Sequence, residues 1–192
     1  MQLARHEIAL RRRLVWLAIG AAISLGGYLL ASVLTYRIGF PLDDAWIHQT
    51  YGRNLAIYGE WAFIPGQPSA GSTAPAWSAL LAVGHQLGLG PYLWTYFIGW
   101  VLLWATGWAG MRCFQLLLPQ QERMGVWVGV FLIFEWHLVW AAGSGMETLL
   151  LGALILIVAG SLLSEKKQNW FALGAMIGAG VWIRPDSVTL AG

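Results

Sequence analysis

Two adjacent carboxylates, Asp43 and Asp44, are the residues whose types and spacing most clearly suit chemistry. They follow Pro41 and precede apolar residues at helical spacing, which predicts that the pair stands at a helix start. One aspartate suffices to cap a helix and complement its dipole, a contribution of about 1 kcal/mol. A second carboxylate beside it suits a shared cation, or a pair whose pKa values are pushed apart so that one member acts as a base.

Three further side chains could join this chemistry. His48 lies one helical turn after Asp44 and could face the same side, with packing or hydrogen bonding as the alternative role. Glu147 follows a glycine-rich break at 143–145 and opens an apolar run, where it could instead cap a helix. Arg184 ends another apolar run, so it could reach lipid phosphate or bind the phosphate of a lipid-linked substrate.

The composition indicates a membrane protein. The chain is 58% hydrophobic and 10% charged, with a mean hydropathy of +0.61, whereas about a quarter of the residues of a soluble domain are charged. The net charge of +2 and the short basic clusters argue against a nucleic-acid partner. Cys113 is the only cysteine, so no internal disulfide can form. The 13 tryptophans are typical of a membrane–water interface.

The apolar runs predict an all-α polytopic membrane protein with about five transmembrane helices. Residues 14–36 carry no charge and would form a helix of about 34 Å, enough to cross a hydrocarbon core. The run at 76–89 is short and predicts an interfacial or re-entrant helix within an external loop of residues 37–91. The remaining spans are expected at about 92–118, 124–142, 146–164 and 170–183.

The arginines before the first span set the expected orientation. Arg5 and the run 11–13 should keep the N-terminus in the cytoplasm, which makes the loop 37–91 external and the cell membrane the expected location. The clusters near 112, 123 and 165–167 then lie inside, while the acidic pair, Glu147 and Arg184 all lie at the external face. The last residues resemble the start of another helix, so we expect a fragment of a longer protein.

Two features of the expected 124–142 span concern helix contacts. Gly125 and Gly129 have the spacing that lets membrane helices approach closely, as do Gly174 and Gly178 in the expected 170–183 span. Glu135 and His137 lie about midway along the span, where ionisable groups are costly. Such groups indicate either function or pairing between helices.

The stretch from Asp43 to Trp77, DDAWIHQTYGRNLAIYGEWAFIPGQPSAGSTAPAW, resembles the membrane glycosyltransferases of the GT-C class. The likeness continues through GMET at 145–148 and RPD at 184–186. It is greatest to members related to protein mannosyltransferases and arabinofuranosyltransferases. The resemblance implies transfer of a sugar from a polyprenyl-phosphate donor to a hydroxyl of a glycan or protein acceptor, at the external face and with inversion.

The resemblance also implies roles for individual residues. Asp43 would be the general base that takes the proton of the acceptor hydroxyl. Asp44 would orient the acceptor or hold a divalent cation such as Mg²⁺, Mn²⁺ or Ca²⁺. From their positions, we expect His48 and Glu147 on the acceptor or cation side, and Arg184 and Arg53 at the donor phosphate.

Two other classes of function remain open. A transporter or lipid-glycan translocase would use Glu135 and His137 inside the helix bundle. A non-catalytic, truncated membrane scaffold would use none of these residues. Comparing the effects of Glu135→Gln and Asp43→Asn would discriminate between transport and transfer.

Overall fold

The computed structural model describes residues 2–164 and 167–191. Within these residues the chain is helical apart from one antiparallel hairpin, formed by β1 (Ala62–Ile64) and β2 (Gln67–Pro68). The expected all-α class is therefore confirmed. Of the expected cytoplasmic cluster at 165–167, Glu165 and Lys166 lie outside the described residues.

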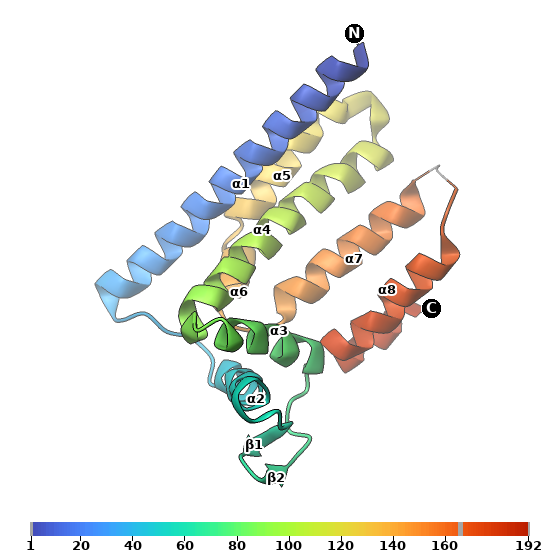
Figure 1. The fold of residues 1–192 in the computed structure, drawn as a ribbon. Helices are drawn as coiled ribbons and strands as arrows, with labels where there is room; N and C mark the ends of the chain where they lie inside the picture. The colour runs from blue at the N-terminus through green and yellow to red at the C-terminus, as the bar shows by residue number, and fades with distance from the viewer. Residues whose placement is uncertain (1, 165–166, 192) are drawn as a thin grey trace.

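The helices form a bundle with two helices packed across one end (Figure 1). The bundle contains α1 (Gln2–Thr35), α4 (Gly90–Leu117), α5 (Gly125–Phe134), α6 (Trp136–Gly143), α7 (Thr148–Leu163) and α8 (Trp170–Ile183). At one end lie α2 (Asp44–Tyr58), α3 (Pro75–Gln86) and the hairpin. Two 3₁₀ segments complete the chain, η1 (Pro119–Met124) between α4 and α5, and η2 (Pro185–Ala191) after α8.

One described helix is long and apolar enough to cross a membrane, and it is the Leu10–Thr35 part of α1. The pair formed by η1–α5 and α6 makes a second such segment if it is counted as one broken span. The helices α7 and α8 are apolar but have only 16 and 14 residues. The number of spans beyond the first therefore stays a prediction.

The expected continuous helix over 124–142 is wrong, because the chain bends by 52° at Glu135. Glu135 has an extended backbone, with φ of −66° and ψ of 124°. Its Oε2 accepts a hydrogen bond of 3.0 Å from the Leu138 backbone N–H, which caps α6. Ser24 of α1 donates to the Ile133 carbonyl at 2.6 Å, so a carbonyl freed by the break has a partner. Side-chain groups thus replace the missing helical hydrogen bonds.

Small residues let α4 approach its neighbours closely. A Cβ on Gly129 would lie 3.0 Å from the Gly107 carbonyl oxygen, so the expected close approach at the 125–129 pair is confirmed. The same expectation for Gly174 and Gly178 is wrong within the described residues, because nothing lies within 4 Å of a Cβ at either position. The α1–α4 contact is fixed by two indoles, because Trp100 and Trp104 donate to carbonyls of α1 at 2.9 and 3.1 Å. Buried Leu17, Leu103 and Ile133 fill the space between these helices.

The close approach of α4 to α6 at Gly99 can be tested by substitution. A Cβ there would overlap the Ala142 carbonyl group, which is backbone and cannot rotate away. Gly99→Ala should therefore lower the stability by roughly 1–3 kcal/mol, seen as a lower thermal unfolding midpoint in detergent. Gly152→Ala is the matched control, because nothing lies within 4 Å of its Cβ position. Equal midpoints for the two variants would contradict this packing.

Candidate active site

The acidic pair stands at the start of α2, as predicted. Asp43 is the N-cap residue, and its Oδ1 accepts a hydrogen bond of 3.1 Å from the Asp44 backbone N–H. Both carboxylates are exposed. Asp44 lines a cavity of about 110 Å³ together with His48, Thr73 and Met146. The expectation that Asp44 and His48 share one side of the helix is therefore confirmed.

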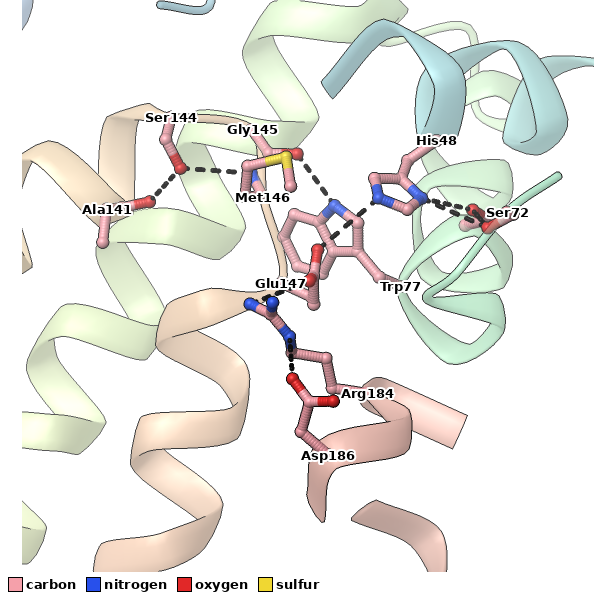
Figure 2. A network of polar contacts seen from close by, with 11 residues as sticks. His48, Ser72, Trp77, Ala141, Ser144, Gly145, Met146, Glu147, Arg184 and Asp186 are labelled. Atoms are coloured by element: carbon pink, nitrogen blue, oxygen red, sulfur yellow. Dashed lines mark hydrogen bonds and ion pairs between the residues drawn. The ribbon is translucent and has the colours of Figure 1, made fainter. Parts of the chain in front are cut away.

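His48 is buried and links α2 to the loop before α3 and to the loop before α7. Its Nδ1 lies 3.2 Å from the hydroxyls of both Ser72 and Ser78, which are 2.8 Å from each other. Its Nε2 lies 3.5 Å from Oε2 of Glu147. One imidazole thus contacts a hydroxyl pair on one side and a carboxylate on the other (Figure 2).

Glu147 continues this chain of contacts to α8. Its Oε1 lies 3.6 Å from Nη1 of Arg184, and Nε of Arg184 lies 3.3 Å from Oδ2 of Asp186. Glu147 is buried, whereas the Arg184 side chain is 41% exposed. Among the described residues, Oε2 of Glu147 has no hydrogen-bond partner, since its contact with His48 is too long to count as one. The carboxylate is held by charge more than by hydrogen bonds.

The pKa of His48 is lowered, chiefly because burial removes water from the charged ring. The carboxylates of Glu147 and Asp44 act in the opposite direction and offset part of this effect. The imidazole is therefore neutral at pH 7. A neutral ring has one N–H and one bare nitrogen, so it can donate to one neighbour and accept from another.

A tight turn before α7 aims Glu147 at His48. Gly145 has φ of 78°, and a Cβ there would come within 2.7 Å of Phe40. The Gly145 carbonyl accepts a hydrogen bond of 2.9 Å from Nε1 of Trp77 in α3. Met146 N–H donates to the Ser144 hydroxyl at 3.2 Å, which closes the turn. Only glycine combines this backbone conformation with the close packing.

Sequence reasoning missed the residues that hold the candidate site. Trp77 and Ser78 fall within an apolar run and carry no motif of their own. Ser72 lies in a turn rich in glycine, serine and proline. Hydroxyls in such a turn can bond backbone or substrate, but the sequence does not say which partner Ser72 has. Ser78 could have been identified from the sequence, because small and polar residues recur one helical turn apart at the start of α3.

The structure does not bring Arg53 to the other candidate residues. Nine residues separate it from Asp44 on α2, which places the two side chains about 180° apart around the helix. Arg53 is exposed and contacts the Asn54 side chain at 3.3 Å. Its expected role at a donor phosphate stays a prediction that no contact in the described part of the chain supports.

Two larger cavities open at the same end of the bundle. One, of about 510 Å³, is lined by the 36–41 segment with Trp46 and Tyr92. The other, of about 610 Å³, is almost wholly apolar and lies between the loop before α3 and Trp182 of α8. Trp182 is two residues before Arg184. The apolar groove includes Ser72, between Gly71 and Thr73 of the small cavity that Asp44 lines, so these two cavities share the loop before α3.

A divalent cation would find few protein ligands here. Among the described residues, no three His, Cys, Asp or Glu side chains are grouped so that they could hold a metal ion. Asp44 lines the small cavity together with Thr73. Mg²⁺ commonly binds through one or two carboxylates and takes its other ligands from water and substrate phosphates. The donor set fits that mode of binding.

We predict asymmetric effects when the Glu147–Arg184 pair is broken. Arg184→Gln should destabilise more than Glu147→Gln, because it leaves a buried carboxylate without its cation. The double variant should be more stable than the sum of the two single effects predicts, as measured by thermal unfolding in detergent. The control is the exposed pair Arg13 and Glu122, whose removal should change stability by only about 0–1 kcal/mol. Additive effects at Glu147 and Arg184 would contradict the coupling.

We also predict that stability falls as the pH drops below about 6.5, the ordinary His pKa. A lowered pKa means that the unfolded chain binds the proton more readily than the folded one, so folding stability is complete above that pH and declines below it. His85 contributes with the same sign, since burial and then Arg53 lower its pKa.

The measurement is the unfolding midpoint between pH 7.5 and pH 5.5. His48→Gln should show a smaller decline than the unmodified chain, with the His85 part remaining. His137→Gln is the control, because the His137 side chain is 84% exposed in the structure. If His48→Gln leaves the decline unchanged, His48 is not its source.

Comparison of the chain with protein-family models, with curated proteins and with solved structures found no match. The functional conclusion therefore depends on the residues and contacts of this chain.

Proposed function

We propose that this chain is an inverting glycosyltransferase that acts at a membrane surface and takes its sugar from a polyprenyl-phosphate donor. The observation that carries the proposal is the chain of contacts from His48 through Glu147 to Arg184, beside an exposed acidic pair. It joins His48, one turn after the acidic pair, to the Arg184 cation within one end of the bundle. An apolar groove beside the cation suits a lipid-linked substrate.

Asp43 is the proposed general base. One of its oxygens caps α2, and the exposed carboxylate can still take a proton from an acceptor hydroxyl. The acceptor oxygen then bonds to the anomeric carbon as the bond from that carbon to the phosphate oxygen breaks. Attack from the face opposite the leaving phosphate inverts the anomeric carbon.

Asp44 orients the acceptor from the wall of the small cavity. Its position beside His48 and Thr73 supports this role. Asp44 is also the residue that would hold a divalent cation. When bound, such an ion would supply positive charge near the donor phosphate.

Arg184 pairs with the donor phosphate as negative charge develops on it. Its partial exposure leaves guanidinium donors free to face a substrate, while Glu147 and Asp186 hold the side chain in place. The groove that begins near Trp182 would receive the first part of the isoprenoid chain. The head group of the donor would thus lie at Arg184, directly after α8, and its tail near Trp182 of α8.

The membrane placement proposed with this function follows the arginine distribution. The basic N-terminal end of α1 lies in the cytoplasm, and the end that carries α2, α3 and the hairpin lies outside. The helices α4 to α8 are then the further spans, with α5 and α6 forming one broken span. The acceptor would be a glycan or protein outside the cell.

We predict that Asp43→Asn lowers sugar transfer by about 10²–10⁴-fold, the usual contribution of general-base catalysis. The assay follows sugar transfer from a polyprenyl-phosphate sugar by the purified chain in detergent or vesicles. Glu122→Gln is the control at the opposite end of the bundle and should leave transfer unchanged. Near-normal transfer by Asp43→Asn, with the protein still inserted in membranes, would overturn the assignment.

A transporter predicts the reverse order of effects, with Glu135→Gln more harmful than Asp43→Asn. The Glu135 and His137 side chains lie 2.7 Å apart at the α5–α6 break, and broken helices are common in transporters. Within this chain, however, His137 faces the outer surface, whereas working pairs in transporters face the bundle interior. The geometry therefore favours the glycosyltransferase.

A further inference from the structure

Another cavity, of about 380 Å³, opens between α4 and α7 at the end of the bundle opposite the acidic pair. Its volume falls within the usual range of small-molecule sites, about 300–1,000 Å³. It is lined from α4 by Trp108 and Arg112, and from α7 by Leu156, Ile157 and Ser161. No role proposed for the acidic end uses any of these residues.

Arg112 is the charged group of this cavity. It lies five residues before the end of α4 and is only partly exposed. Its Nη1 donates to Oε1 of Gln115 at 3.3 Å, which is a long hydrogen bond to a neutral group. The carboxylate of Glu122 pairs instead with Arg13, at 3.3 Å. Among the described residues, no carboxylate lies within ion-pair distance of Arg112.

The cavity walls combine a polar end with an apolar body. Gln168 closes the polar end, and its Nε2 donates to the carbonyls of Ser161 and Ser164 at 2.6 and 2.9 Å. Leu156 and Ile157 supply an apolar wall one to two turns before that end. Trp108 lies one turn before Arg112 on the same side of α4, and its ring suits a membrane–water interface.

We infer that this cavity binds the phosphate of an anionic phospholipid, with Arg112 on the phosphate and the apolar wall against the first part of an acyl chain. A guanidinium recognises phosphate through paired hydrogen bonds, and basic pockets between transmembrane helices on the cytoplasmic side bind such head groups. The inference rests on the membrane placement proposed above. It does not depend on glycosyl transfer, because the two sites lie at opposite ends of the bundle.

The test titrates the purified full chain in detergent with phosphatidylglycerol, with phosphatidylcholine and with inorganic phosphate, following the thermal unfolding midpoint. Phosphatidylglycerol should raise the midpoint at concentrations where phosphatidylcholine does not. Arg112→Gln should weaken that binding by at least about tenfold, the loss expected for a charged hydrogen bond. Arg123→Gln is the matched control, since Arg123 is exposed at the same end and does not line the cavity.

Two more variants separate the sources of the phosphate. Ile157→Trp fills the space beside the apolar wall. It should therefore weaken the binding of phosphatidylglycerol but leave any effect of inorganic phosphate on the unfolding midpoint unchanged. Arg112→Lys keeps the charge without the paired donors and should bind at an intermediate level, which preserves the test if Arg112→Gln does not fold. If phosphatidylglycerol and inorganic phosphate raise the midpoint equally, and Ile157→Trp changes neither shift, the site binds free phosphate. That result would overturn the inference that the ligand is a lipid.

Equal effects of the two phospholipids would overturn the inference. So would an equal loss in Arg112→Gln and Arg123→Gln, because it would show a general surface charge effect. Sugar transfer by Arg112→Gln should stay near normal in the same preparations. The outcome of the lipid-binding test is therefore independent of whether the proposed glycosyltransferase activity is correct.

Discussion

The carboxylate of Glu147 is the buried charge on which the candidate site depends. It touches His48 of α2 on one side and Arg184 after α8 on the other, so one side chain ties together parts of the chain that are 99 and 37 residues away. A buried carboxylate is costly unless cations and hydrogen bonds compensate it. The partly exposed Arg184 and the long contact to His48 supply only part of that compensation. The remainder of the fold must therefore hold the three groups together.

Packing at the same end of the bundle provides that support. Trp77 fills the space between α3 and the turn at Gly145, and its indole donates to that turn. Gly52 of α2 faces the Ser78 carbonyl, where a Cβ would come within 2.9 Å, so α2 and α3 lie in direct backbone contact. These short contacts fix His48 relative to Glu147. The acidic pair is then presented at the exposed start of a helix whose other face is packed against α3.

Helix positions could be predicted from the sequence because they follow from apolar runs and breaks. The expected ranges 92–118, 146–164 and 170–183 correspond to α4, α7 and α8 within a few residues. The acidic pair at a helix start followed from Pro41 and the spacing after it. The break at Glu135 could not be predicted in this way, because Glu135 competes for a backbone N–H that an unbroken helix would use itself. The partners of His48 were also hidden, since Ser72 and Ser78 lie 24 and 30 residues further along the chain.

The hydroxyl pair on His48 has a consequence for movement of the loop before α3. Ser72 belongs to that loop, whereas Ser78 belongs to α3, and both bond the same ring nitrogen. Lifting the loop would remove one partner and admit water to the imidazole, which raises its proton affinity. Loop opening and proton uptake are therefore thermodynamically linked, so each must favour the other.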